Sequence, residues 1–532
     1  MPSTYTYPGV YVEEIPSGVR TIAGVSTSDT AFIDFFPRGP MNEAVRVTGM
    51  QDFARRFGGD DPSGLHPLSE ASYAIKQYYL NGGQIAWVVR VAGGQPIAAK
   101  RVFPAGGSPP SGKLELEAAA PGVWGNTLDV GIDHNARDPA TEFNLVAREV
   151  RTVQGRRQVV NSEIHRNLSM DTSSPRFVKD AVNADSDLLL VTDVGAGPRP
   201  APTGPDVTSP AIVGDPDPDP PTLFLALGEN QDPAPSDGTV PDAGALTAGL
   251  AALDKIAPNV FNILCLPGVA SLESGATTVL EDAVKFCTDR RAFCIIDVPA
   301  GIGADELLAW VDANVPQSRN AAVYFPRVEV SDPLNENRPR EMGPSGTLAG
   351  VYARTDATRG VWKAPAGTDA RLNGVTLVET LTDLENGGLN PFGINVLRTF
   401  PVFGRVAWGA RTREGADQQA SEWKYIPVRR TALYIEESLA QGLKWVVFEP
   451  NDEPLWSQIR LNVGAFMNDL FRQGAFQGTT PAQAYFVKCD AETTTQTDID
   501  RGIVNILVGF APLKPAEFVV IRIQQIAGQI ET

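Results

Sequence analysis

The sequence predicts a multidomain protein that combines α/β and α+β regions with a separate β-rich domain. Three observations lead to this fold class. The chain has 532 residues, enough for several hydrophobic cores. Residues 96–200 alternate polar and apolar side chains with the period of strands, whereas residues 246–412 alternate helical and strand patterns. Residues 201–245, between these two regions, are rich in Pro and Asp.

The first 95 residues combine an extended segment with a compact one. Residues 1–20 contain the strand-like stretch "YPGVYVEEI" between Pro8 and Pro16, and no partner strand precedes it. Residues 21–95 contain a strand in "TSDTAFIDFF", an amphipathic helix in "SEASYAIKQYYLNGG" and a buried strand in "QIAWVVRVA". We therefore expect an N-terminal arm followed by a compact segment.

Residues 96–200 are typical of a β-rich domain. The stretches "GKLELEAAA", "NTLDVGIDH", "EFNLVAREV" and "RQVVNSEIH" are separated by turn residues, which predicts a sandwich or a small barrel. In residues 201–245, proline removes the donors that a sheet needs, and no Lys or Arg occurs between Arg199 and Lys255. This stretch is predicted to be an exposed loop outside any sheet.

Residues 246–412 predict a parallel sheet with helices on its faces. The helical stretches "ALTAGLAALDKI", "TTVLEDAVKFCTDRR" and "ADELLAWVDANV" alternate with "VFNILCLPG", "AFCIIDVPA" and "AAVYFPRV", which are short and apolar.

Residues 413–512 predict an α+β domain. The sequence indicates a helix that ends at Gly442, a strand in "LKWVVFE", and a long helix at 453–473 with Asn451 or Asp452 as its N-cap. Two further strands, "GIVNILVGF" and "EFVVIRIQQI", close the chain, and the second falls in the terminal segment 513–532. The long helix carries one apolar stripe, formed by Leu455, Ile459, Val463, Phe466 and Leu470.

Charge and hydropathy restrict the possible partners. The formal net charge of −18 argues against general binding to nucleic acid, which needs a basic surface. No stretch approaches the ~20 apolar residues of a membrane span, and the sequence does not begin like a signal peptide. We expect a protein made in the cytoplasm that does not insert into a membrane by itself.

The four cysteines, Cys265, Cys287, Cys294 and Cys489, include no CxxC pair, and three of them lie in apolar stretches. They are predicted to be buried free thiols of a reducing compartment rather than disulfides or metal ligands.

Sequence motifs for phosphate binding fail at the positions that the chemistry needs. "GSPPSGKL" at 107–114 matches the start of a phosphate-binding loop, but Leu114 replaces the magnesium-binding hydroxyl, and two prolines remove amide donors. The stretch is predicted to be a surface turn.

Motifs for calcium binding and for hydrolysis fail as well. Asp215, Asp217 and Asp219 have calcium-loop spacing, but Pro220 stands where glycine is needed. All three histidines precede the α/β region, so a Ser-His-Asp triad within it is not expected. We predict no catalytic, cofactor-binding or metal-binding residues, and no enzyme.

Several longer stretches resemble the contractile tail sheath family of bacteriophages and of phage-tail-like contractile injection systems. They are "YPGVYVEEIPSGVRTIAGVSTS" at the start, "PSGTLAGVYARTDATRGVWKAPAG" at 344–367, "NPFGINVLRTFPVFGRVAWGARTRE", and "WKYIPVRRTALYIEESLAQGLKWVVFEPNDEPLWSQIR". The resemblance implies a subtilisin-like fold without subtilisin activity for residues 246–412. It also implies that the β-rich region is an outward-facing insertion and that both chain ends are extended strand arms.

The resemblance further implies a structural function. Such subunits stack as hexameric rings in a helical sheath around an inner tube, and contract from a metastable extended state to drive the tube through a target envelope. The implied partners are copies of the chain, the inner tube protein, and baseplate and tail terminator or cap proteins. The implied location is a phage tail or an injection particle assembled in a bacterial cytoplasm. Another self-assembling protein, such as a capsid or adhesin component, and a hydrolase-like enzyme stay as alternatives.

Two groups of residues follow as candidates for assembly contacts. The arms, at about 7–15 and 516–527, would each add a strand to a sheet shared with neighbouring subunits; the alternative is that both strands pair within their own chain. Arg460 and Arg472 on the long helix are candidates for tube contact, or else solvated helix residues. The arm strands comprise Val10, Tyr11, Val12, Glu13, Phe518, Val519, Val520, Ile521, Arg522 and Ile523.

Overall fold

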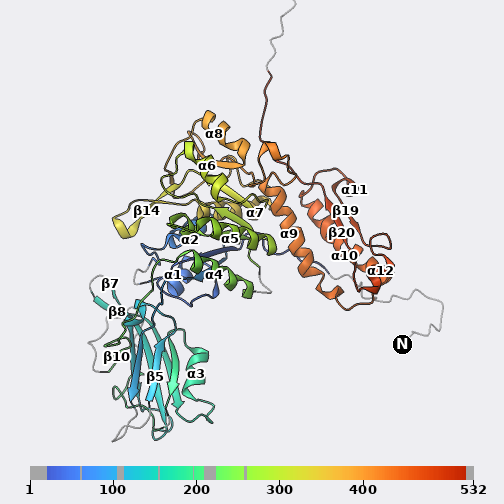
Figure 1. Cartoon of the computed structure of the whole chain (residues 1–532). Helices are drawn as coiled ribbons and strands as arrows, with labels where there is room; N and C mark the ends of the chain where they lie inside the picture. Colours follow the sequence, from blue (N-terminus) through green and yellow to red (C-terminus); the bar gives the residue numbers. More distant parts are fainter. Residues whose placement is uncertain are drawn as a thin grey trace, which may run out of the picture. The chain divides into compact units, whose positions relative to one another are not determined.

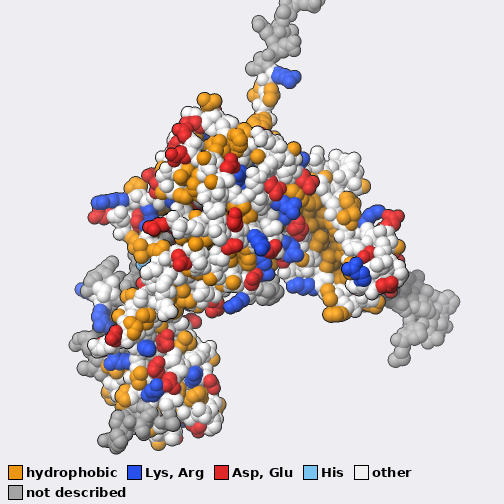
Figure 2. Space-filling view, in the orientation of Figure 1, with side chains coloured by type: hydrophobic (Ala, Val, Ile, Leu, Met, Phe, Trp, Pro, Cys, Tyr) orange, Lys and Arg blue, Asp and Glu red, His pale blue; other side chains and the backbone are white. Residues whose placement is uncertain are grey.

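A computed structural model describes most of the chain (Figure 1). The residues described form two compact units, of which one is Ser26–Arg429 and the other combines Arg430 onward with the residues before Ser26. Charged side chains of both signs are interspersed on the face drawn in Figure 2, as on an ordinary solvated surface. None of the helices in this part of the chain is long and apolar enough to cross a bilayer. The described ranges are 21–59, 63–104, 113–153, 156–195, 197–208, 223–256 and 260–522.

An eight-stranded sheet forms the centre of the larger unit, with the order β18-β17-β13-β12-β11-β1-β3-β2. Its six inner strands are parallel, and antiparallel strands close both ends. Ala31 lies opposite Leu264 on one side and Trp87 on the other, so the segment before residue 95 shares this sheet with the α/β region. The strands are β1 (Thr30–Asp34), β2 (Ala44–Val47), β3 (Ala86–Arg90), β11 (Ile263–Cys265), β12 (Phe293–Ile296), β13 (Ala321–Phe325), β17 (Ile394–Phe400) and β18 (Gly404–Ala407).

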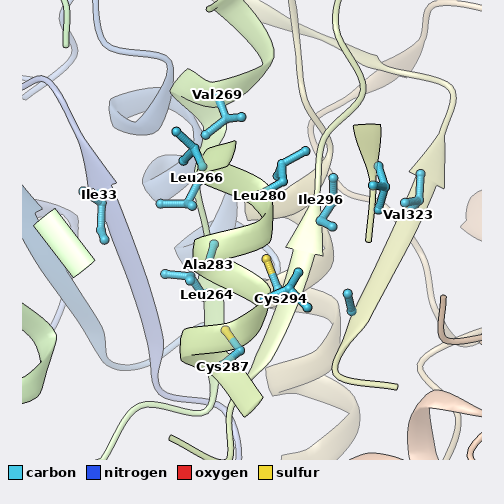
Figure 3. Packing of buried hydrophobic residues seen from close by; sticks show 14 of the residues in the cluster. Ile33, Leu264, Leu266, Val269, Leu280, Ala283, Cys287, Cys294, Ile296 and Val323 are labelled. Atoms are coloured by element: carbon cyan, nitrogen blue, oxygen red, sulfur yellow. The ribbon is translucent and has the colours of Figure 1, made fainter. Parts of the chain in front are cut away.

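Helices cover both faces of the sheet, as the alternation of patterns predicted. On one face α4 (Ala243–Leu253), α5 (Ala276–Asp289) and α6 (Ala304–Asn314) bury an aliphatic cluster, part of which Figure 3 shows around Cys287 and Cys294. Residues one position along each strand point to the opposite face, where they meet α2 (Glu70–Leu80) and α7 (Ser345–Arg359).

Smaller elements complete the larger unit. β14 (Val328–Asp332) pairs with both β15 (Arg338–Met342) and β16 (Thr376–Leu377) in a three-stranded sheet. In the sequence, helix α1 (Met50–Phe57) lies between β2 and β3, and helix α8 (Asp383–Leu389) precedes β17.

The β-rich region forms two antiparallel sheets that share one core, in agreement with the predicted sandwich alternative. One has the order β10-β6-β7-β8 and the other β4-β5-β9, with α3 (Val178–Asp185) packed beside them. The shared core has its own members, from Ala99 to Leu227, and none of them belongs to the cluster under the eight-stranded sheet. The strands are β4 (Lys100–Pro104), β5 (Lys113–Ala118), β6 (Leu128–Asp133), β7 (Glu142–Val153), β8 (Arg156–Ser169), β9 (Leu189–Val194) and β10 (Leu225–Ala226).

The chain enters and leaves the β-rich domain at one place. The backbones of Gly93 and Thr239 donate hydrogen bonds to each other, both at 2.9 Å, and Ile97 pairs with Ser236. The prediction that residues 201–245 lie outside any sheet is wrong at β10, which pairs with β6, because prolines are absent from those two positions. The sequence positions of the tested calcium-loop aspartates lie outside the described residues, as do most of those of "GSPPSGKL".

The smaller unit is built on two long helices. α9 (Ile426–Gly442) crosses from the larger unit into it, and α10 (Glu453–Arg472) carries the predicted stripe, all five members of which are buried. Asp452, one of the two proposed caps, accepts a hydrogen bond from the Leu455 N–H at 3.2 Å. β19 (Tyr485–Lys488) and β20 (Leu507–Phe510) form a two-stranded antiparallel sheet, and α11 (Pro481–Ala484) and α12 (Gln496–Asp500) are short.

One strand prediction in the smaller unit fails, and a second stays a prediction because it concerns pairing with a neighbouring subunit. "LKWVVFE" forms a single 3-10 turn, Lys444–Val446, and no strand, although β-branched and aromatic residues favour one. A strand needs a hydrogen-bonded partner, and this segment lies in the short connection between α9 and α10. Residues 517–522, within "EFVVIRIQQI", form neither helix nor strand in the isolated chain.

Candidate assembly surface

The carboxyl edge of the parallel sheet is where an α/β enzyme would place its active site. Asp34 ends β1 and Asp297 follows β12, and both carboxyl groups are buried. Asp34 accepts hydrogen bonds from the backbone N–H groups of Phe35 and Ala71, each at 2.8 Å. Asp297 accepts from the Ser345 N–H at 2.8 Å and from its hydroxyl at 2.5 Å. Each carboxyl group therefore fixes the first turn of a helix, α2 or α7.

This edge lacks the arrangement of a hydrolase. Ser345 is fully buried, and its Oγ donates to the buried Asp297 carboxyl group rather than to a histidine. The premise that every histidine lies outside the α/β domain is wrong for His66, because β1 and β3 on either side of it belong to the same sheet. The Nδ1 atom of His66 nevertheless accepts a hydrogen bond from the Leu68 N–H at 3.2 Å. Among the described residues, the His66 ring is not hydrogen-bonded to Asp34 or Ser345.

Burial perturbs the two carboxyl groups strongly. Loss of hydration raises the pKa of Asp34 to about 7, against the opposing hydrogen bonds from Ala71 and Phe35. Loss of hydration likewise raises the pKa of Asp297 to about 7, although Ser345 and Arg327 favour the ionised form. Perturbed carboxyl groups are common in active sites, but here the side chains are 2% and 7% exposed, which leaves a substrate no access.

All four cysteines are buried free thiols, as predicted. Within the described ranges, no group of three or more His, Cys, Asp and Glu side chains could hold a metal ion.

The two-stranded sheet β19–β20 has unused backbone groups. Tyr485 pairs with Phe510 and Lys488 with Leu507, and the strand order of the described residues places no third strand on either outer edge. One face packs on α10, where the Tyr485 hydroxyl donates to the Gly464 carbonyl at 3.4 Å. An isolated pair of strands is marginally stable in water, and its edges are templates for further strands.

Exposed apolar side chains accompany these free edges. Phe486 of β19 is 51% exposed and Leu507 of β20 is 53% exposed. The Phe486 ring lies over Gly509, where an added Cβ would be 2.3 Å from the ring. A covering strand would bury this surface.

The described part of the predicted C-terminal arm is also apolar and exposed. Phe518, Val519, Val520 and Ile521 are 74%, 81%, 77% and 79% exposed. Figure 1 draws this segment as an extended trace, and Figure 2 shows apolar side chains along it. Four consecutive large apolar residues in water are unfavourable, by roughly 1.5–3 kcal/mol for each side chain that could be buried. Arg522 is exposed, and Ile523 lies outside the described residues.

The chain leading from the N-terminal arm is anchored on α9. Val25 N–H donates to the Ser438 hydroxyl at 3.2 Å, and Ile22 is buried against Gly442. At Gly24 an added Cβ would be 2.0 Å from the Tyr434 hydroxyl, so a larger residue would force the Tyr434 side chain to shift. The arm residues Val10, Tyr11, Val12 and Glu13 themselves lie outside the described residues.

The two candidate arginines of α10 differ in their surroundings. Arg460 donates to Glu453 at 2.5 Å and also to the Cys489 carbonyl, so its guanidinium already has partners in the chain. Arg472 is exposed in the last turn, where a cation complements the helix dipole. Leu461, between them on the helix, is 53% exposed. Their contact with a tube stays a prediction.

Two features could not be recognised from the sequence: the strand β19 and the burial of Asp34 and Asp297. β19 lies in "GAFQGTTPAQAYFVKCD", and its four residues are too few for a clear period of two. The burial of Asp34 and Asp297 depends on pairing between distant segments, which no local pattern reveals.

Comparison with known proteins relates the chain to tail sheath proteins. Residues 418–526 match the phage tail sheath C-terminal domain family. The chain is 27% identical over 289 residues to a putative prophage major tail sheath protein of Pseudomonas aeruginosa, over 53% of this chain and 69% of that protein. It is 26% identical over 258 residues to the tail sheath protein of Vibrio phage KVP40, over 46% of this chain. The match spans only 37% of that phage protein's length.

Solved structures share the fold along nearly the whole chain. The contracted helical sheath of the anti-feeding prophage matches 98% of this chain and 100% of its own, with a TM-score of 0.57 and 22% identity. A sheath tail protein from Listeria innocua matches 93% of this chain and 96% of its own, with a TM-score of 0.56 and 14% identity. The mixed α/β multidomain fold is therefore that of sheath proteins.

Proposed function

We propose that this chain, which carries the phage tail sheath C-terminal domain at residues 418–526, is the subunit of a contractile sheath. Subunits stack as hexameric rings around an inner tube, and the sheath contracts from a metastable extended state to drive that tube through a target envelope. The particle is a phage tail or a contractile injection system, assembled in the bacterial cytoplasm. The free edges of β19–β20, followed in the chain by an exposed apolar terminal segment, are the observation that carries the proposal.

Strand exchange connects the subunits. The N-terminal arm of one neighbour and the C-terminal arm of another add strands to the outer edges of β19–β20. Val10, Tyr11, Val12 and Glu13 supply the first strand, and residues 518–523 supply the second. Each ladder of about six hydrogen bonds contributes roughly 0.5–1.5 kcal/mol per bond, before the cost of ordering the arm. The arms act as tethers that let the subunit bodies rotate and slide without separating.

The remaining parts have supporting roles. The α/β region corresponds to the family's subtilisin-like core, which works as a scaffold without turnover. The β-rich domain faces outward, as the resemblance implies, and its separate core supports its being an inserted domain. α10 faces the inner tube, with Arg472 the better candidate because Arg460 is already engaged. Baseplate and terminator or cap proteins bind the two ends of the polymer.

Removing the first arm tests the proposal. A variant without residues 1–15 keeps every described contact, so it should remain folded but fail to form a contraction-competent sheath. Negative-stain electron microscopy of the purified polymer measures this. The matched variant for the second arm is Val519→Lys with Ile521→Lys, which adds charge to exposed positions without disturbing a core.

The outcomes separate the alternatives. Hollow helical tubes from the intact chain, and their loss in both arm variants, support the proposal. Normal contracting tubes from both variants would falsify strand exchange. Closed shells from the intact chain would instead favour a capsid component, and steady turnover of ester, peptide or nucleotide substrates would favour an enzyme.

A further inference from the structure

A cavity of about 190 Å³ opens beside the C-terminal end of α7, inside the larger unit. Three cationic side chains line it, Arg354 and Arg359 from α7 and Lys363 from the turn that follows. Thr355 and Thr358 also line it, but each hydroxyl already donates its proton to a carbonyl of α7, that of Val351 or Arg354, both at 2.8 Å, and is not counted as a ligand. Asp369 is the single carboxylate among the lining residues. The cavity lies far in sequence from the arms and from α10.

Backbone carbonyl groups hold two of these cations in place. Arg354 Nη1 donates to the Asn81 carbonyl at 2.8 Å, and its Nη2 donates to the Arg371 carbonyl at 2.6 Å. Lys363 Nζ donates to the carbonyls of Ala364 and Ala366, at 2.8 Å and 3.3 Å. An ammonium group has three donors, so one N–H of Lys363 keeps its hydrogen-bonding capacity. No carboxylate among the described residues lies within ion-pair distance of either cation.

Within the part of the chain that the structure describes, the positive charge of the cavity is only partly compensated. Arg359 pairs with Asp369 at 3.6 Å, and both side chains are largely exposed. The carbonyl end of α7 supplies a further partial charge of about −0.5. An alternative role for the cations is to neutralise that helix end. Three cations against one carboxylate and the helix end still leave a surplus of about one and a half positive charges, which this role does not explain. Burial lowers the pKa values of Arg354 and of Lys363, and for Lys363 the nearby Asp369 opposes this shift without cancelling it.

We propose that this cavity is a binding site for a single oxyanion group, with Lys363 and Arg359 as its main ligands and Arg354 behind them. A phosphate or a carboxylate has the size and charge that such a cavity accepts, and cations prepositioned by carbonyl groups need little reordering to bind it. The oxyanion has two possible sources. It is either a free phosphate group or an Asp or Glu side chain of a second copy of this acidic chain, and the second source rests on the proposed self-assembly.

Inorganic phosphate is the probe for the site itself. The line width of the ³¹P resonance is followed as the full chain, kept as a monomer, is added at constant ionic strength. Lys363→Met removes the charge but keeps the length of the side chain, and should weaken phosphate binding by about tenfold or more. Lys363→Arg keeps the charge and should retain most of the binding.

A second variant, Arg359→Gln, tests the site in case Lys363→Met fails to fold. Arg359 is exposed, so its substitution should leave the fold intact. Its matched control is Arg338→Gln. Arg338 is another exposed arginine paired with an exposed carboxylate, Glu336 at 2.9 Å, outside the residues that line the cavity. Arg359→Gln should weaken phosphate binding, and the control should leave it unchanged.

Polymer assembly distinguishes the two sources. If a carboxylate of a second copy fills the cavity, phosphate inhibits polymerisation of the unmodified chain and Arg359→Gln polymerises poorly. If free phosphate is the ligand, polymer yield is the same with and without Arg359→Gln, while the ³¹P signal still responds. The proposal is overturned if phosphate binds none of the proteins, or all of them equally, and the variants polymerise like the unmodified chain. A chain that never polymerises contradicts the proposed function but leaves the ³¹P result decisive for the cavity.

Discussion

Asp34 and Asp297 show how single residues serve the fold rather than catalysis. Each carboxyl group accepts two hydrogen bonds and lies at the N-terminus of a helix, where the dipole favours a negative charge. Loss of hydration outweighs these contributions, and both pKa values rise to about 7. Near neutral pH, ionisation of these two buried carboxyl groups therefore lowers the stability of the folded protein.

This conflict predicts a pH-dependent effect of Asp297→Asn. The folded pKa of Asp297, about 7, exceeds the ordinary value of 3.8, so the protonated form stabilises the fold. This contribution is complete below about pH 4 and is lost as the pH rises to 7. Asn cannot ionise, and it still accepts from the Ser345 N–H while donating to its hydroxyl. Relative to the unmodified chain, the variant should gain roughly 2–3 kcal/mol more at pH 8 than at pH 5, because about two units of the titration lie between pH 5 and the folded pKa and one pKa unit corresponds to about 1.4 kcal/mol. Urea unfolding followed by circular dichroism at both pH values measures this.

The control for this variant is Asp185→Asn, which changes an exposed carboxylate at the end of α3. Its effect on the free energy of unfolding should be small at both pH values. An equal gain from Asp297→Asn at pH 5 and pH 8 would contradict a raised pKa for Asp297.

Residues whose role depends on neighbours in sequence could be predicted. The Asp452 cap and the buried stripe of α10 follow from spacing along one helix, and the buried cysteines follow from their apolar surroundings. Asp34 could not be recognised in the same way. Its burial and its hydrogen bond to Ala71 arise only when β1 lies between β3 and β11.

At the scale of elements, the contact between α2 and α7 depends on two glycines one turn apart. A Cβ on Gly346 would be 2.3 Å from the Ala74 carbonyl oxygen, and one on Gly350 would be 2.5 Å from the Tyr78 carbonyl oxygen. Both obstacles are backbone atoms, which cannot move without shifting the helix. The "SGTLAG" stretch therefore sets the distance between these helices.

Gly346→Ala should destabilise the larger unit by about 1–3 kcal/mol, because an overpacked helix contact forces the backbone to shift. Gly387→Ala, in α8 of the same unit, is the matched control, since nothing lies within 4 Å of the added Cβ. It should stabilise the unit by up to about 1 kcal/mol through helix propensity. Thermal unfolding measures both, and a loss of similar size in the two variants would contradict the packing argument.

The failed strand prediction for "LKWVVFE" and the missed strand β19 have one cause. Propensity describes how a residue fits a pleated sheet but not whether a partner strand is available. Val447 is 63% exposed with no ladder, whereas Tyr485–Lys488 pairs with β20 despite its short length. Helices such as α9 and α10, which bond within themselves, were predictable for the opposite reason.

At the scale of the whole molecule, the change of pattern near residue 95 coincides with the start of two antiparallel sheets that have their own core inside the larger unit. The eight-stranded sheet was only partly predictable, because β1 and β3 join β11 across an insertion of more than a hundred residues. Local patterns specify each strand, but strand order depends on which apolar faces meet in three dimensions. The buried ion pair between Arg38 and Glu149, at 3.0 Å, joins the β-rich domain to the rest of the unit and has no sequence signature.

The insertion geometry leads to a prediction for the whole chain. Gly93 and Thr239 already pair like the ends of a tight hairpin, and the glycines next to them, Gly94 and Gly238, have φ values of +69° and +80°. A two-residue type I′ turn requires positive φ at both central positions. Deleting residues 95–237 would join Gly94 directly to Gly238 and would place these two glycines in such a turn.

The shortened chain should fold, because the cluster under the eight-stranded sheet contains no residue from the deleted segment. Arg38 and Arg90, now buried beneath the β-rich domain, would regain water as they lose Glu149 and the Pro121 carbonyl, so neither would remain as a buried unpaired charge. Size-exclusion chromatography should give a monodisperse monomer with cooperative unfolding and a larger helical signal per residue. If the deletion instead gives an aggregated or molten product, the two cores depend on each other, and the β-rich domain is part of the folding unit rather than an addition to it.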